Sequence, residues 1–144
     1  MSYILNFECK YIDDVMKIWL NSNINTHYFI KEFYWHNNFD FVKQCIKNSE
    51  VYVYINNKNI LCGFIGIENG YIQGLFVDEN FRSIGIGKFL LDYVKNLYNR
   101  LEVSVYEKNI KAVNFYKKNN FNILERIFKE DTMEYEYKML FENG

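Results

Sequence analysis

The centre of the chain contains a segment that changes from a strand pattern to a helix pattern across a short loop with two glycines. Residues 71–77 have the composition of a β-strand, and residues 86–97 carry apolar side chains at helical spacing. The loop between them ends in the run from Arg82 to Lys88. A strand that enters a helix through a tight loop is typical of layered α/β proteins, so this segment limits the fold class first.

The remaining residues continue this alternation of strands and helices. Strands are predicted at residues 3–7, 51–55, 60–67, 71–77, 101–105, 121–128 and 133–141. Helices are predicted after Ile12, between about Thr26 and Lys47, over residues 86–97, and from the cap Asn109 to about Asn119. The region from Thr26 to Lys47 is either one helix or two helices that break near Asn37 and Asn38. This order predicts an α/β layer fold built on a mixed sheet.

Length, charge and hydropathy exclude several classes of protein. The 144 residues, 49% of them hydrophobic, suit a single domain, 1–144, with a full apolar core. A formal net charge of -1 gives no electrostatic reason to expect a nucleic acid as partner. Every apolar run is far shorter than the roughly 20 residues that a membrane helix needs. We therefore expect neither nucleic acid nor membrane among the partners.

The N-terminal residues and the cysteines bear on the cellular compartment. The first six residues lack a basic stretch followed by a long apolar one, which predicts a cytoplasmic rather than a secreted protein. Cys9, Cys45 and Cys62 stand in three unrelated contexts, with neither paired spacing nor a nearby histidine. We expect reduced, mostly packed thiols and no bound metal.

The loop from Arg82 to Lys88 has the properties of an anion site. Glycine lets the backbone approach a ligand closely, and the first N–H groups of a helix have no intrahelical partners. The helix dipole adds partial positive charge, and the two end residues of the loop add full charges. The P-loop pattern fails because Phe89 follows Lys88, and the dinucleotide pattern GxGxxG fails because Leu90 replaces its last glycine. A diphosphate is the expected ligand.

Two sequence motifs carry a family resemblance. The run from Arg82 to Gly87 matches RxxGxG. A second pattern, N-x-x-A-x-x-F-Y-x-x-x-x-F, follows the next predicted strand and is matched by Asn109, Ala112, Phe115, Tyr116 and Phe121. In this order and separation, the motifs resemble those of the GNAT N-acetyltransferase superfamily. The resemblance implies the GNAT fold, with a mixed, mostly antiparallel central sheet of six to seven strands flanked by about four helices.

The resemblance also implies acetyl-CoA as a co-substrate and assigns residues to it. The strand before the loop would contact the pantetheine arm through the backbone of Leu75, Phe76 and Val77. The diphosphate would lie on the loop residues Arg82, Ser83, Ile84, Gly85, Ile86, Gly87 and Lys88. In the second motif, Phe115 and Tyr116 would contact the cofactor, and Asn109 would bond the pantetheine, cap its helix, or do both.

The reaction implied by the resemblance is acetyl transfer to a primary amine that attacks the thioester directly in a ternary complex. Tyr116 is the candidate general acid for the departing CoA thiolate. The backbone N–H of Phe76 or Val77 would polarise the thioester carbonyl. Gln73, which cannot ionise, stands where relatives often carry an acid. The amine proton would pass through water to one of three candidates, Glu68, Glu107 or His27, unless the amine arrives partly neutral.

The acceptor is an amine on a small molecule or on a protein, and the sequence leaves both open. The aromatic residues that follow Thr26 either line an acceptor site with His27 or pack the helices on the sheet: Tyr28, Phe29, Phe33, Tyr34 and Trp35. The protein is expected as a monomer or homodimer. A CoA-binding sensor without catalysis is the alternative function, because an obvious base is missing. A dimerising structural domain with a simple glycine turn is a third.

Overall fold

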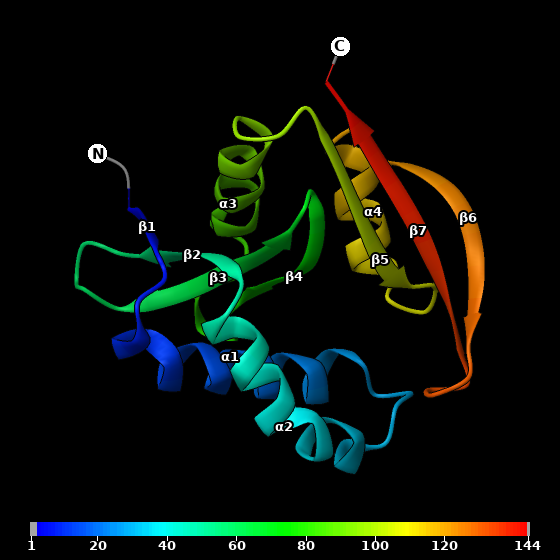
Figure 1. Ribbon diagram of the computed structural model, residues 1–144, viewed down its shortest axis with the longest axis horizontal. Helices are drawn as coiled ribbons and strands as arrows, with labels where there is room; N and C mark the ends of the chain where they lie inside the picture. The colour runs from blue at the N-terminus through cyan, green and yellow to red at the C-terminus, as the bar shows by residue number, and fades with distance from the viewer. Residues whose placement is uncertain (1–2, 144) are drawn as a thin grey trace.

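A computed structural model describes residues 3–143 and shows one central sheet with helices on both of its faces (Figure 1). Within these residues the strands are β1 Ile4–Asn6, β2 Glu50–Ile55, β3 Leu61–Glu68, β4 Tyr71–Val77, β5 Arg100–Tyr106, β6 Asn122–Lys129 and β7 Glu134–Glu142. The helices are α1 Ile12–Thr26, α2 Glu32–Lys47, α3 Ile86–Lys95 and α4 Ile110–Lys118, with short 3-10 turns η1 Cys9–Tyr11 and η2 Glu79–Phe81. The predicted fold class is confirmed.

The pairing of the strands changes from antiparallel to parallel at the centre of the sheet. Its strand order is β1-β2-β3-β4-β5-β7-β6, and all neighbours are antiparallel except β4 and β5. These two strands are parallel and pair only at Tyr71 with Glu102 and at Ile72 with Val103. Beyond Ile72 they diverge, and Figure 1 shows the opening between them. The sheet therefore consists of two halves that are joined at one end of β4.

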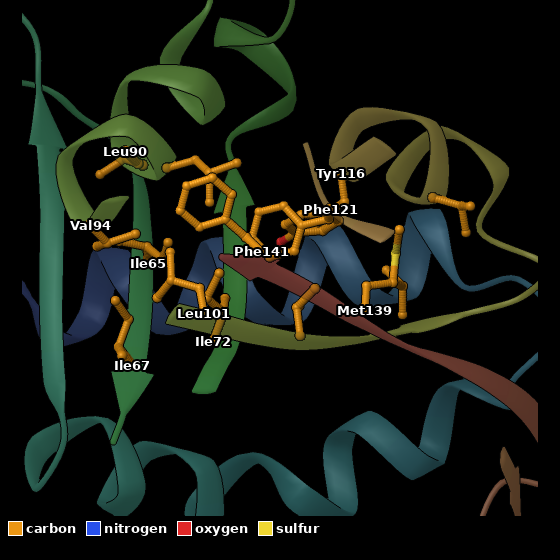
Figure 2. Packing of buried hydrophobic residues seen from close by; sticks show 14 of the residues in the cluster. Ile65, Ile67, Ile72, Leu90, Val94, Leu101, Tyr116, Phe121, Met139 and Phe141 are labelled. Carbon is orange, nitrogen blue, oxygen red and sulfur yellow. The ribbon is translucent and has the colours of Figure 1, made fainter. Parts of the chain in front are cut away.

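The helices α3 and α4 cover one face of the sheet through a continuous apolar core (Figure 2). On α3, Leu90 and Val94 are fully buried, as the helical spacing predicted, and Leu91 is buried beside them. They meet the β-branched side chains of Ile65 and Ile72 on β3 and β4. Burial of one such side chain contributes about 1.5–3 kcal/mol, so this face holds α3 firmly against the sheet.

The helices α1 and α2 cover the opposite face with a second core. Trp19 of α1 and Trp35 of α2 are buried and meet edge to face at 5.9 Å between ring centroids. Of the two alternatives for the region after Thr26, α2 is one uninterrupted helix. There is no break near Asn37 and Asn38, and the Asn38 side chain lies along its own helix, where it donates to the Tyr34 carbonyl at 2.7 Å.

Two other expectations concern membrane spans and thiols. Among residues 3–143, no helix combines the length and the apolar character that crossing a bilayer requires. All three cysteines are free, and Cys62 is fully buried. Cys9, by contrast, is exposed in η1, so the expectation of packed thiols does not hold there.

Candidate active site

The opening between β4 and β5 forms a cleft of about 870 Å³. Phe115 and Tyr116, which belong to the core on the α3 and α4 face, line it from one side. Trp19 and Trp35, which belong to the core on the α1 and α2 face, line it from the other. The cleft therefore passes through the sheet from one face to the other.

A β-bulge in β4 separates the two strands. The pairing with β3 steps from Ile67–Ile72 to Gly66–Gly74, so Gln73 is an extra residue on β4. A bulge bends its strand and increases the local twist, which turns residues 73–77 away from β5. Those residues stay paired to β3 on their other edge. Their backbone groups on the β5 side are thus presented to the cleft, which agrees with the expected contact of Leu75, Phe76 and Val77 with a pantetheine arm.

The glycine loop forms a second cavity of about 310 Å³ next to the cleft. It is lined by Val77, Phe81, Arg82, Ser83, Gly85, Ile86, Gly87, Lys88 and Phe115, four of which also line the cleft. Ser83 and Gly85 have left-handed backbones, with φ of 69° and 87°. Gly85 is the N-cap of α3 and places no side chain on the first N–H groups of the helix. Those groups remain available to an anion.

Gly87 has no side chain that would occupy the space beside this loop. A Cβ at this position would contact the Phe115 ring at 3.6 Å and the Val77 side chain at 3.8 Å, both ordinary distances. Packing inside the protein therefore does not require glycine here. The glycine instead leaves room in the two cavities that it lines.

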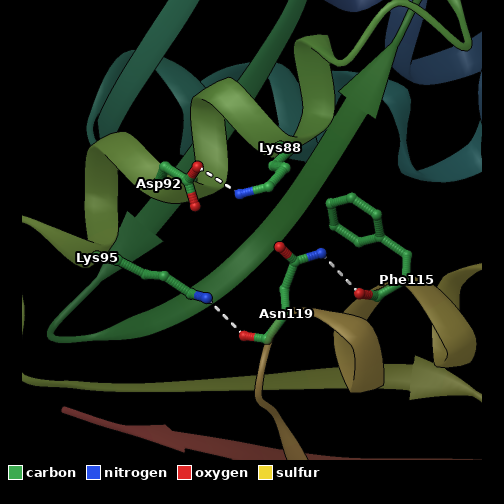
Figure 3. A network of polar contacts seen from close by, with 5 residues as sticks. All are labelled: Lys88, Asp92, Lys95, Phe115 and Asn119. Atoms are coloured by element: carbon green, nitrogen blue, oxygen red, sulfur yellow. Dashed lines mark hydrogen bonds and ion pairs between the residues drawn. The ribbon is translucent and has the colours of Figure 1, made fainter.

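The charged residues of the loop are held in different ways. The Arg82 Nε donates to the Val77 carbonyl at 3.3 Å, which keeps the guanidinium where the two cavities meet. Lys88 lies along α3 and forms an ion pair with Asp92 at 2.7 Å (Figure 3). Ile84 is exposed and is not among the side chains that line either cavity, so only its backbone is a candidate contact.

The helix α4 carries the second motif and is anchored at both ends. At its start, Asn109 accepts the Ala112 N–H at 3.3 Å, which confirms the predicted cap. At its end, Asn119 donates to the Phe115 carbonyl at 2.8 Å and accepts from Lys95 of α3 (Figure 3). Asn120, which directly precedes the last Phe of the motif, adopts a left-handed conformation with φ of 72°. The Lys95 contact joins the end of α4 to α3.

Tyr116 lies where the core meets the cleft. It is only 5% exposed and contacts Phe115 and Phe121 edge to face, yet it lines the cleft. Burial raises the pKa of its phenol, so the hydroxyl is protonated at neutral pH. No hydrogen bond from this hydroxyl is found within residues 3–143, so the proton is not committed to another protein group. This position is compatible with the acid function predicted for it.

His27 joins the two sides of the cleft through a chain of side-chain hydrogen bonds. Its Nδ1 lies 2.9 Å from Asn23 Oδ1, and its Nε2 lies 3.1 Å from Asn109 Nδ2. The Asn23 amide nitrogen donates to Trp19, and the Asn109 oxygen accepts from α4, so the directions of all bonds are determined. His27 is therefore neutral, with its proton on Nδ1. Because its lone pair already accepts from Asn109, His27 is poorly placed to serve as a base.

The two carboxylates that were predicted to accept the amine proton are not among the residues that line the cleft. Glu107 forms two hydrogen bonds with Arg126, at 2.5 and 3.1 Å, and this partner lowers the pKa of its carboxyl. Glu68 accepts from Gln73 at 2.7 Å and is likewise absent from the lining residues. Gln73 does line the cleft. The structure thus does not bring Glu107 or Glu68 to the place where a base is needed.

Glu136 of β7 is a cleft residue that the sequence analysis did not select. It lies directly opposite Tyr106 of β5, and both line the cleft. It is half-buried, and burial raises the pKa of its carboxyl. Its local sequence does not distinguish it from Glu134 or Glu142 on the same strand. Only the strand register places it in the cleft.

The buried His27 is expected to make stability depend on pH. Burial lowers its pKa from 6.5 to about 4. As pH falls through 6.5, the unfolded chain takes up a proton that the folded chain refuses until about pH 4. The contribution of His27 to the free energy of unfolding is therefore complete above pH 6.5. It is lost between pH 6.5 and 4, by about 3 kcal/mol.

Urea unfolding at several pH values between 7 and 4 measures this effect. The variant His27→Gln should lose the part of the pH dependence that His27 supplies. The matched variant His36→Gln, at an exposed histidine on α2, should keep it. Parallel curves for wild type and His27→Gln would contradict the assignment.

Comparison with known proteins agrees with this geometry. The family model for the acetyltransferase (GNAT) domain matches residues 47–123. The peptidyl-lysine N-acetyltransferase YiaC of Escherichia coli K12 is 32% identical over 120 residues, which cover 82% of each chain. The solution structure of apo YjaB from Escherichia coli superposes with a TM-score of 0.86 at 24% identity, over 98% of this chain and 97% of that one. An acetyltransferase of Bacillus anthracis strain Ames, solved with acetyl coenzyme A, superposes with a TM-score of 0.61 at 22% identity, over 67% and 63%.

The matched region contains the features from which the site is built. It spans more than half of the chain and includes both the glycine loop from Arg82 to Lys88 and the α4 motif from Asn109 to Phe121. The similarity to YiaC covers a larger share of the chain than the family model does. The chain belongs to the GNAT family of acetyltransferases.

Proposed function

We propose that this protein transfers the acetyl group of acetyl-CoA to the side-chain amine of a lysine in another protein, by direct attack in a ternary complex. The observation that carries the proposal is the continuous cleft through the sheet. One of its ends adjoins the glycine loop, and the other opens among aromatic residues of α1 and α2. The name of the relative YiaC supports a peptidyl lysine as acceptor.

The dimensions and chemistry of the two cavities suit acetyl-CoA. The smaller cavity offers a diphosphate the N-terminus of α3, with Arg82 at its border. From there the free edge of residues 73–77 leads into the cleft. The thioester end would then lie near Tyr116, where the two faces of the sheet meet. The crystal structure of the Bacillus anthracis protein with acetyl coenzyme A supports this cofactor class.

The chain supplies two groups for acetyl transfer at that position. The backbone N–H of Phe76 or Val77 polarises the thioester carbonyl and stabilises the negative charge that develops on its oxygen. Tyr116 donates its phenolic proton to the departing sulfur. A phenol that burial keeps protonated is suited to this step.

A catalytically inactive CoA sensor is the second candidate. One observation favours it, because Glu107 is engaged by Arg126 and Gln73 by Glu68. The candidate base Glu107 is thus held by Arg126, and Gln73, which cannot ionise, stands where relatives often carry an acid. The presence of Tyr116 in the cleft favours the enzyme.

Calorimetry with acetyl-CoA, followed by a thiol-release assay, separates these functions. We expect saturable binding of acetyl-CoA and release of CoA thiol with a lysine peptide. A peptide whose only amine is its N-terminus and a small diamine serve as comparison acceptors. Absence of acetyl-CoA binding would reject both functions, and binding without turnover on any acceptor would support the sensor.

A further inference from the structure

The acceptor side of the cleft has aromatic walls and one acidic group. Trp35 and Tyr106 lie around the His27 ring, at 5.6 and 4.8 Å between centroids. Glu136 is the one carboxylate among the residues that line the cleft within the described part of the chain. Aromatic faces next to a carboxylate favour a cation, and an alkyl ammonium in particular.

Glu136 sits on the face of the sheet where an acceptor would enter. It is paired with Tyr106 in the antiparallel register of β5 and β7, so the two side chains lie on the same face. Tyr106 packs against the α1 and α2 core rather than the α3 and α4 core. The carboxylate is therefore on the side opposite to the glycine loop. Lys108, which also lines the cleft, lies over the Phe29 ring of this side and forms an ion pair with Glu134 at 3.2 Å.

The surroundings of Glu136 contain both signs of charge. Asp131 of the β6–β7 turn adds negative charge, and Lys129 of β6 adds positive charge. Tyr34 of α2 donates a hydrogen bond to Asp131 at 3.0 Å, and Tyr106 of β5 lies opposite Glu136. Burial is the largest influence and raises the pKa of the Glu136 carboxyl.

We propose that Glu136 binds the ammonium group of the acceptor and then accepts one of its protons, an inference that rests on the proposed acetyl transfer. The other candidates are eliminated by their contacts. His27 has its lone pair occupied by Asn109, and Glu107 is held by Arg126 outside the cleft lining. A carboxyl whose pKa lies above its usual range is closer to the operating pH that a general base requires.

The step balances in atoms and charge. The acceptor enters as an ammonium ion, and Glu136 takes one proton from it. The neutral nitrogen attacks the carbonyl carbon, a C–N bond forms, and the C–S bond breaks. The sulfur takes a proton from Tyr116, which regains one from the nitrogen through water. Glu136 releases its proton to solvent, so the products are the amide, the CoA thiol and one H⁺.

The test compares Glu136→Gln with wild type in binding and in turnover. With CoA-saturated protein, calorimetry uses Nα-acetyl-lysine amide and Nα-acetyl-norleucine amide, which lacks the amine. Wild type should bind the lysine compound more tightly, and Glu136→Gln should bind the two equally. In the thiol-release assay, kcat/KM for a lysine peptide should fall by roughly 10²-fold or more, and Glu136→Asp should restore part of it. Acetyl-CoA affinity should not change.

The pH profile and a matched variant make the outcome specific. Wild-type kcat/KM should fall on the acid side as Glu136 is protonated, and this limb should vanish in Glu136→Gln. Glu142→Gln, the same exchange at an exposed position of β7, should behave as wild type. Unchanged lysine binding, kcat/KM and pH profile in Glu136→Gln would overturn the inference. Selective ammonium binding without turnover in wild type would instead reject the proposed transferase and leave the ammonium site standing.

Discussion

Gly87→Glu is expected to abolish measurable acetyl-CoA binding while leaving the free protein at least as stable as wild type. The new carboxylate would stand in the cavity where the diphosphate is proposed to lie. Two like charges about 4 Å apart repel by about 4 kcal/mol at an effective dielectric constant of about 20, which corresponds to roughly 10³-fold in affinity. Calorimetry with acetyl-CoA measures the loss.

The stability of this variant separates a binding defect from a folding defect. Gly87 is the second residue of α3, where a side chain fits at ordinary contact distances and a negative charge favours the helix. The thermal midpoint of the free variant should not fall, and acetyl-CoA should raise the midpoint of wild type alone. Gly87→Gln matches the volume without the charge and should retain weak binding. Wild-type affinity in Gly87→Glu would contradict the proposed diphosphate site.

Tyr116→Phe is expected to lower kcat by roughly 10²- to 10⁴-fold, the range for loss of a general acid. Acetyl-CoA affinity should stay within a few-fold, because the ring that lines the cleft is retained. Stability should change little, because the hydroxyl has no hydrogen-bond partner within the described residues. Steady-state thiol release and calorimetry give the two quantities.

A matched exchange on the neighbouring helix tests whether the effect belongs to the site. Tyr93 of α3 packs against the same core but lines neither cavity. Tyr93→Phe should therefore leave kcat unchanged. If Tyr116→Phe keeps wild-type kcat, the proton for the CoA sulfur must come from another group.

The pattern of apolar residues was sufficient to predict most of the strands and helices. The α3 stripe and the strand before it were predicted within a few residues, because both signals are local in the chain. The cap at Asn109 was predicted for the same reason. Each of these features depends on residues that are only a few positions apart.

The uninterrupted helix α2 is a feature that the local sequence left undecided between one helix and two. Asn37 and Asn38 are weak helix formers, and in isolation they favour a break. Trp35 and Ile46 are buried against the sheet, which stabilises the helix across that point. The tertiary contact decided between the two alternatives.

On the acceptor side of the cleft, the local sequence likewise does not determine which polar residues lie together. His27 and Asn109 are 82 residues apart, and their hydrogen bond exists only because α1 and α4 meet at the cleft. Glu136 is placed by its register against Tyr106, whereas Glu107, just before the second motif, is directed to Arg126. A list of acidic residues could not distinguish them.

The sequence by itself determined the fold class, the family and the position of the glycine loop, because short motifs and periodic apolar residues lie within one strand, one turn or one helix. Only the tertiary structure decided which polar side chains enter the cleft. That depends on the bulge at Gln73, which opens the sheet, and on strand register, which turns alternate residues to opposite faces. Neither can be read from the residues that it positions, because both arise from hydrogen bonds to a neighbouring strand.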